Sequence, residues 1–272
     1  MRIALWNEPL LDYFARSAEA LAQHLKIEVS RQSRRACRDR IVKGTADIAL
    51  VPTLSLYKES DLYDALPAVA ISSWQNPYLS LLLKAELGTG VSTVAIDPAF
   101  PQEALIAKIL LKEHYAASPR FLPIENLSAP DLSRTEADAA VLVSAASTDQ
   151  PQDRGHVDLG QDWFELTHYP MVWGVFVLRK GEAETKAVNA LRDIARYTEL
   201  YRQEWLEEES IPEPFYTFFN EKLRYRLDDL AVASLTSFQD YLYYNEAVEE
   251  MTPVPFFEVD PSEDDDEDQP LL

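Results

Sequence analysis

Cysteine is almost absent from this chain of 272 residues, in which Cys37 is the single example. A disulfide and a cysteine-based metal cluster are therefore both excluded within one chain. Cys37 stands among basic residues in "RRACRDR", and an ordinary position on a helix is a simpler account of it than a reactive thiol.

Glycine is also scarce, with seven residues in the whole chain. Neither G-x-G-x-x-G nor G-x-x-x-x-G-K-[ST] occurs, so no phosphate-binding loop is expected. The four histidines are dispersed and form no H-E-x-x-H pair, and the G-x-S-x-G turn of serine hydrolases is missing. We therefore expect no metal site and no cofactor.

No apolar run approaches the roughly 20 residues that a membrane-spanning helix needs. The longest runs, "AVLVSAA" and "MVWGVFVL", have the length of strands. A secretory signal peptide needs about 7–15 apolar residues after a basic start, whereas here Asn7-Glu8-Pro9 follows the first short apolar run. We expect a soluble, cytoplasmic protein with no membrane partner.

Basic residues are few, since 25 lysines and arginines face 46 acidic residues and the formal net charge is -21. Eight of the acidic residues lie between Glu258 and Asp268 with no basic residue among them, and the rest of the chain is acidic too. Such a charge repels nucleic acid phosphates and anionic lipids, so no nucleic acid partner is expected. A small anionic substrate remains open if arginines or helix N-termini supply local positive charge.

Strand-like and helix-like patterns alternate along most of the chain, which predicts an α/β fold. Strand-like runs occur at 3–6, 26–30, 46–52, 67–74 and 79–85, and again at 93–97, 119–125, 139–145 and 171–178. Helical spacing is seen between the first strands and over 101–115, and long amphipathic helices are predicted over 182–209 and within 215–247. The glycine-containing segment "ELGTGVS" is a candidate hinge, and the acidic run after residue 257 is predicted to be disordered.

Polar residues follow several of the predicted strands. In open α/β sheets, ligands bind beside the carboxyl ends of the strands. Taken singly, each of these residues also suits a helix N-cap, and Asn7 before Glu8-Pro9 fits a helix start. If several of these residues lie around one cleft, a binding site is favoured over helix capping. The candidates are Asn7, Thr53, Ser55, Ser72, Ser73 and Asp97.

Five stretches carry a resemblance to a known family. They are "WNEPL", "KGTADIALVPTLSLY", "AISSWQNPYLSLLL", "TVAIDPAFPQEALIAKILLKEHY" and "VDLGQDWFELTHYPMVWGVFVLR". Their order and content resemble the chorismate dehydratase family of the futalosine menaquinone pathway, and the similarity extends over about residues 1–248.

The resemblance implies an α/β, two-lobed fold like that of type 2 periplasmic solute-binding proteins, with a helical C-terminal segment. Lobe 1 would comprise residues 1–90 plus 175–257 and lobe 2 residues 91–174, with the ligand held between them. The disordered acidic tail would be 258–272.

The activity implied by the resemblance is that of a carbon-oxygen lyase which removes water from chorismate to give 3-[(1-carboxyvinyl)oxy]benzoate. Asn7 matches the family's asparagine beside the reacting ring and would be the catalytic residue. Substrate contacts are implied for Thr53, Ser72, Ser73 and Ser80, and we add Asp97 as a strand-end candidate. Loss of water creates an aromatic ring, so the protein mainly orients the substrate and excludes solvent.

The chain departs from the family pattern at three places. Only Glu8 separates Asn7 from Pro9, where the family usually has two residues, and this places an acid near a dianionic ligand. The segment 98–102 replaces a Ser/Thr-rich turn, and Ser144-Ala145 replaces a Gly-Asp pair. These departures leave open a divergent cytosolic protein that binds another small acid, or a related enzyme acting on one. A partner surface on the aromatic C-terminal helices ("FYTFF", "YLYY") is a third hypothesis, for which helical core is the simpler account.

Overall fold

The computed structural model describes residues 1–84, 90–143, 155–182 and 184–258. The chain divides into two compact units: unit 1 comprises Met1–Ser72 and Val172–Leu272, and unit 2 comprises Ser73–Met171. Most of the candidate hinge, all of the acidic tail after Glu258, and the substituted pair at 144–145 lie outside the described residues.

Unit 1 is built on a mixed sheet with the strand order β11-β4-β10-β3-β1-β2. Strand β1 pairs in parallel with β2 and β3, and β10 pairs antiparallel with β3. The strands are β1 (Arg2–Trp6), β2 (Glu28–Gln32), β3 (Ile48–Pro52), β4 (Tyr63–Ser73), β10 (Met171–Arg179) and β11 (Leu223–Arg224). Strands β1, β3 and β10 are buried almost throughout, because helices cover both faces of the sheet.

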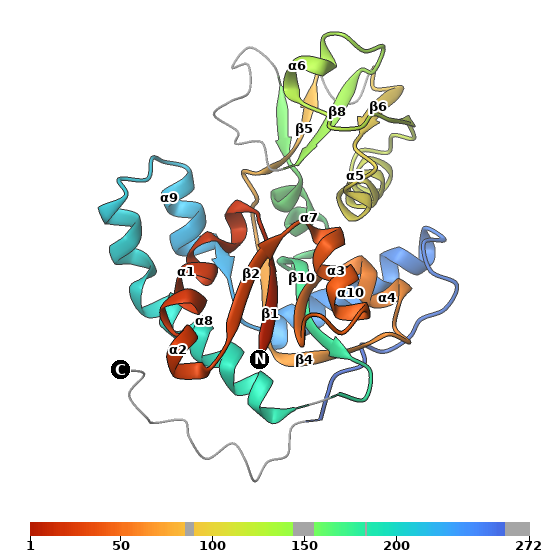
Figure 1. Cartoon of the computed structure of the whole chain (residues 1–272). Coiled ribbons are helices and arrows are strands. Elements are labelled where there is room, and N and C mark those ends of the chain that lie inside the picture. Colours follow the sequence, from red (N-terminus) through yellow and green to blue (C-terminus); the bar gives the residue numbers. More distant parts are fainter. Residues whose placement is uncertain (85–89, 144–154, 183, 259–272) are drawn as a thin grey trace. The chain divides into compact units, whose positions relative to one another are not determined.

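Figure 1 shows α1 and α8 on one side of this sheet and α3, α4 and α10 on the other. The helical elements of unit 1 are η1 (Pro9–Leu11), α1 (Asp12–Ala20), α2 (Ala22–Leu25), α3 (Arg34–Val42), α4 (Thr53–Lys58), α8 (Thr185–Glu208), α9 (Phe215–Thr217), η3 (Phe218–Lys222) and α10 (Asp229–Tyr244). Cys37 lies buried on α3, where burial raises the pKa of its thiol to about 12, which keeps it protonated and unreactive. The prediction of an ordinary helix position is confirmed.

The aromatic C-terminal segment belongs largely to the core. Phe215, Phe218 and Phe219 of "FYTFF" are buried, whereas Tyr243 and Tyr244 at the end of α10 are 43% and 73% exposed. Core packing therefore accounts for the first aromatic group.

Unit 2 contains a second sheet with the order β7-β6-β8-β5-β9. Strand β6 pairs in parallel with β7 and β8, and β5 pairs antiparallel with β8 and β9. Its elements are β5 (Leu79–Leu83), β6 (Thr93–Ile96), α5 (Pro101–Glu113), β7 (Arg120–Pro123), α6 (Ala129–Leu132), β8 (Ala139–Val143), β9 (His156–Asp158) and α7 (Leu159–Thr167).

The division between the units differs from the sequence-based boundaries, which follow residues 90 and 174. The chain leaves unit 1 after Ser72 and returns to it at Val172. Strand β5, placed in lobe 1 from the sequence, pairs with β8 and β9 in unit 2. A short, fully apolar run such as "LSLLL" specifies a buried strand but not its partners, so the sequence pattern does not assign it to a sheet.

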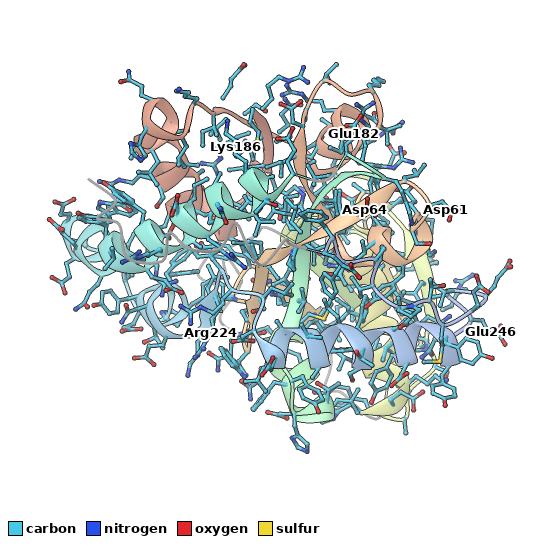
Figure 2. All side chains as sticks on the ribbon, turned by 90° about the horizontal axis from the view of Figure 1, so that it is seen from below. Asp61, Asp64, Glu182, Lys186, Arg224 and Glu246 are labelled. Carbon is cyan, nitrogen blue, oxygen red and sulfur yellow. The ribbon has the colours of Figure 1, made fainter. Side chains whose placement is uncertain are left out.

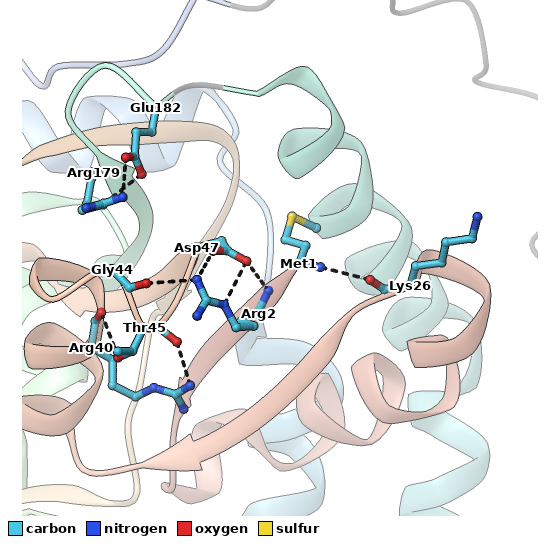
Figure 3. A network of polar contacts seen from close by, with 9 residues as sticks. All are labelled: Met1, Arg2, Lys26, Arg40, Gly44, Thr45, Asp47, Arg179 and Glu182. Carbon is cyan, nitrogen blue, oxygen red and sulfur yellow. Dashed lines mark hydrogen bonds and ion pairs between the residues drawn. The ribbon is translucent and has the colours of Figure 1, made fainter.

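Hydrogen bonds to two carboxylates tie loops of unit 1 to its sheet. Asp47 pairs with Arg2 at the start of β1, with Oδ1 2.6 Å from the guanidinium Nη2, and the same nitrogen donates to the carbonyl of Gly44 (Figure 3). The pairing with Arg2 lowers the pKa of Asp47. At the same end of the sheet, the backbone N–H of Gly181, just after β10, donates to Asp64 near the start of β4 at 2.7 Å, and Figure 2 labels Asp64 and Glu182 in this region.

Strand β1 packs against β10 through a large aromatic ring. An alanine Cβ at Gly174 would lie 2.4 Å from Cη2 of Trp6 and 2.9 Å from the carbonyl oxygen of Val51. The indole Nε1 of Trp6 also donates to the carbonyl of Leu50 at 2.9 Å. The ring therefore occupies the space that a side chain at residue 174 would need.

No helix among the described residues combines the length and apolar character that a bilayer crossing requires.

Gly174→Ala is expected to lower the free energy of unfolding by about 1–3 kcal/mol, because the new methyl group overlaps the Trp6 ring. Gly90→Ala is the matched control, since a Cβ there meets no atom within 4 Å. The control is expected to change stability by less than about 1 kcal/mol. Urea unfolding followed by circular dichroism measures both, and equal stabilities would contradict the packing argument.

In unit 2, Asp138 joins the starts of β6 and β8. Its Oδ2 accepts from the N–H and hydroxyl of Ser92 (2.9 and 2.8 Å) and from the N–H and hydroxyl of Thr93 (both 2.9 Å). These hydrogen bonds, that of the Ser92 hydroxyl foremost, lower the pKa of Asp138 to about 2.

This shift predicts a pH-dependent contribution to stability. Because the pKa of Asp138 is depressed in the folded state, the contribution is present above the ordinary carboxyl pKa and is lost as pH falls towards 2. Asp138→Asn is expected to be less stable than the wild type at pH 7, with the difference shrinking between pH 5 and pH 2. Denaturant unfolding across this range is the measurement, and a difference that does not depend on pH would refute the assignment.

Candidate functional site

The carboxyl ends of β1 and β3 lie side by side at one edge of the unit 1 sheet. The register pairs Ala4 with Ala49, and continuing it places Asn7 beside Pro52. Asn7 and Thr53, which follow these strands, therefore lie on neighbouring strand ends, as sequence reasoning expects of parallel strands.

The Asn7 side chain is exposed at this edge. Its backbone N–H donates to the carbonyl of Gln32 at 2.8 Å, which continues the pairing of β1 with β2 by one residue and holds the backbone in place. The N-cap of η1 is Glu8, and no side chain caps that helix. The helix-capping alternative for Asn7 is therefore wrong, and its side-chain amide makes no hydrogen bond to any residue that the structure describes.

Thr53 and Ser72 are both buried at the same edge of the sheet, at 1% and 2% exposure. Thr53 begins α4, and its hydroxyl donates to the carbonyl of Val172 at 2.7 Å, which ties α4 to the first residues of β10. The hydroxyl of Ser72, near the end of β4, has no hydrogen-bond partner within the described residues. The Thr53 hydroxyl proton is thus already used, whereas that of Ser72 is available to a ligand.

Next to Asn7, Glu8 forms a buried ion pair with Arg34, the first residue of α3. The two N–H···O distances are 2.7 and 2.8 Å, and the side chains are 10% and 11% exposed. The guanidinium of Arg34 also lies over the Trp6 ring, 4.5 Å from its centroid. The negative charge that Glu8 brings to this edge is therefore compensated locally by a bidentate partner.

The remaining candidates lie in unit 2. The hydroxyl of Ser73 donates to the carbonyl of Gln75 at 2.5 Å, within the turn that follows β4. Ser80 is 2% exposed on β5, where it pairs with Leu142 and with Asp158 across the sheet. The candidate residues are therefore divided between the units, with Asn7, Thr53, Ser55 and Ser72 in unit 1 and Ser73, Ser80 and Asp97 in unit 2.

Asp97 shapes the turn before α5. Its Oδ1 accepts from the N–H of Ala99 at 2.9 Å, and its carbonyl accepts from the N–H of Phe100 at 3.0 Å. Phe100 is the N-cap of α5 and Pro101 its first residue. The carboxylate of Asp97 thus accepts a backbone N–H hydrogen bond in the turn where the resembled family has Ser or Thr hydroxyls.

Sequence reasoning missed Asp158, which organises the start of α7. This partly buried carboxylate accepts from the N–H groups of Asn76, Gly160 and Gln161 at 2.8–3.0 Å. Burial raises its pKa against the opposing effect of these hydrogen bonds. Gly160 is required by the close packing, because a Cβ there would lie 2.8 Å from the backbone of Gln75. The available signal was the "DLG" of a stretch already singled out.

Sequence reasoning also missed that Glu8 pairs with Arg34, since 26 residues separate them. It treated the histidines as dispersed, whereas His114, Asp162 and Glu165 come together on unit 2. Neither grouping has a short sequence motif, because each joins separate helices or loops.

The architecture places this chain among proteins with the periplasmic-binding-protein fold. The periplasmic aliphatic sulphonate binding protein SsuA of Escherichia coli superposes with a TM-score of 0.67 at 13% identity, covering 93% of this chain and 95% of SsuA. A crystal structure of protein AF1704 of Archaeoglobus fulgidus gives a TM-score of 0.66 at 16% identity, covering 91% of this chain and 98% of that one. The fold expectation is confirmed.

Comparison of the sequence with known families shows the family to which this chain belongs. A family described as menaquinone biosynthesis matches residues 8–244, and this chain belongs to it. The chorismate dehydratase of Thermus thermophilus is 27% identical over 172 residues, and the match covers 57% of this chain and 63% of that enzyme.

Arg34→Met is expected to lower the free energy of unfolding by about 3–5 kcal/mol, because it leaves the buried Glu8 carboxylate without its partner. Adding Glu8→Gln to that variant is expected to recover much of the loss. The control is Arg226→Met, which breaks an exposed pair with Glu199 and should cost at most about 1 kcal/mol. Chemical denaturation of the four proteins decides the matter, and equal costs for the two arginine variants would refute the role of the buried pair.

Proposed function

We propose that this protein is a chorismate dehydratase, a hydro-lyase of menaquinone biosynthesis that acts in the cytoplasm. The substrate is chorismate and the product 3-[(1-carboxyvinyl)oxy]benzoate. Membership of the menaquinone biosynthesis family and the similarity to the Thermus thermophilus chorismate dehydratase support the proposal.

The observation that carries the proposal is the position of Asn7 and the absence of a hydrogen bond from its side-chain amide to the described residues. Its backbone is held by Gln32 at the end of β1, while its amide group is exposed and makes no hydrogen bond to the described residues. An amide positioned in this way has a donor for the departing hydroxyl or for a substrate carboxylate. Ser72, with its hydroxyl available, supplies a second neutral group at the same edge.

The charge arrangement at this edge suits an anionic substrate. Glu8 is the acidic residue nearest in sequence to Asn7, and its carboxylate is paired bidentately with Arg34. A paired carboxylate and guanidinium present a much weaker field to a ligand than an isolated carboxylate does. The departure of this chain from the family pattern at Glu8 is therefore compatible with a dianionic substrate.

The reaction makes modest demands on the protein. The ring loses a proton from C3 and hydroxide from C4, and these leave together as water while the ring becomes aromatic. Aromatisation supplies the driving force, so the protein contributes orientation of the ring and hydrogen bonds to the leaving oxygen. We assign the leaving-group role to Asn7 and substrate contacts to Thr53, Ser72, Ser73, Ser80 and Asp97.

Purified protein incubated with chorismate is expected to form the aromatic enol ether, followed by ultraviolet absorbance and by a mass decrease of one water. Asn7→Ala is expected to lower kcat by about 10²–10³-fold, the usual cost of removing one preorganised donor. Asn189→Ala on α8 is the matched control and should retain wild-type kcat. Unchanged chorismate with the wild type, or equal rates for both variants, would refute the proposal.

Binding of a different small acid is the second candidate, and Asp97 is the observation that favours it. Its carboxylate accepts the hydrogen bond of the Ala99 N–H in the turn before α5. Its negative charge disfavours binding of an anionic group at that turn. A thermal-shift panel of aromatic and shikimate-derived acids distinguishes the candidates, because a ligand stabilises only the protein that binds it. A melting temperature raised by another acid but not by chorismate would select the second candidate.

A further inference from the structure

A group of potential metal ligands lies on unit 2, where α5 packs against α7. His114 is the C-cap of α5, and Asp162 and Glu165 are three residues apart on α7, so the two carboxylates share one helix face. One potential ligand atom from each of the three side chains lies within 4.8 Å of the others.

The distance between His114 and Glu165 is close to the distance between two ligands of one metal ion. Nε2 of His114 and Oε2 of Glu165 are 3.8 Å apart, which is too long for a hydrogen bond. Two ligands of one tetrahedral ion, each bound at 2.0–2.2 Å, are separated by roughly 3.4 Å. His114 and Glu165 are both exposed, so small rotations of their side chains close the remaining gap.

Neutral donors outside the group orient both carboxylates. The hydroxyl of Tyr115 donates to Oδ2 of Asp162 at 2.7 Å, and Nε2 of Gln161 donates to Oε1 of Glu165 at 2.9 Å. Each carboxylate thus keeps its second oxygen for another partner. Hydrogen bonds of this kind hold the ligands of protein metal sites in place.

The electrostatics of the group also favour a cation. Asp162 is 6% exposed, and Glu165 lies three residues further along the same helix. Two carboxylates in one small volume repel each other when both are ionised, and a divalent ion removes that repulsion.

We propose that His114, Asp162 and Glu165 bind a divalent transition-metal ion of the Zn²⁺ class. Imidazole nitrogen with carboxylate oxygen is a donor set that Zn²⁺ accepts, and three protein ligands leave the fourth position to water. The ion would link the end of α5 to α7. This site does not rest on the proposed function, because none of its residues belongs to the substrate site assigned above.

The test is calorimetric titration of ZnCl₂ into the full chain after removal of metals with a chelator. Millimolar MgCl₂ is present throughout, so that weak binding to the many surface carboxylates is saturated. The wild type is expected to bind one equivalent of Zn²⁺. His114→Asn and Glu165→Gln are each expected to weaken binding at least about tenfold, and Tyr115→Phe by about tenfold or more, because Asp162 loses its orienting donor.

His156→Asn, which changes an exposed histidine on β9 of the same unit, is the matched control and should bind Zn²⁺ like the wild type. Both ligand substitutions are at exposed positions, and circular dichroism verifies that these variants fold. Titration with CoCl₂ gives an independent readout, since the visible absorption of Co²⁺ reports ligand geometry and should disappear in His114→Asn. Absence of stoichiometric Zn²⁺ binding, or equal affinity in the wild type and His114→Asn, would overturn the proposal.

Discussion

The close contact between Trp6 and Gly174 is the constraint on which the candidate site in unit 1 depends. The indole ring lies where a side chain of β10 would otherwise be, and its N–H is bound to the carbonyl of Leu50. This packing fixes the end of β1 relative to β3 and β10, since protein interiors are close-packed and leave little room for alternatives. Asn7 and Glu8 follow the ring directly in sequence, so their backbone positions follow from it.

The Trp6 ring also contacts the ion pair between Arg34 and Glu8. The proposed function requires a chain with a net charge of -21 to bind an anionic substrate, and unpaired carboxylates must then lie away from the site. Arg34 stacks on Trp6 while both of its donor positions towards Glu8 are used, which holds the ion pair in one geometry. Packing and charge compensation are thus coupled at one strand end, and the neutral groups of Asn7 and Ser72 remain for a ligand.

Unit 2 uses a carboxylate differently at the start of α7. Asp158 accepts hydrogen bonds from three backbone N–H groups. Gly160 lacks a side chain, so the helix contacts the turn at Gln75. Further along the same helix, Asp162 and Glu165 face the end of α5. One short helix therefore carries a structural cap at its start and a cluster of metal-ligand type at its middle, and only the first has a local sequence signature.

The sequence by itself determined the α/β class, most strands and long helices, and the family, because these depend on local periodicity and on contiguous motifs. It also placed Asn7 and Thr53 at neighbouring strand ends, since parallel strands present their carboxyl ends at one edge. Tertiary structure alone decided the sheet to which β5 belongs, the pairing of Glu8 with Arg34, and the grouping of His114 with Asp162 and Glu165. The physical reason is that these contacts join residues far apart in the chain, and their energy depends on burial and distance, which no local pattern encodes.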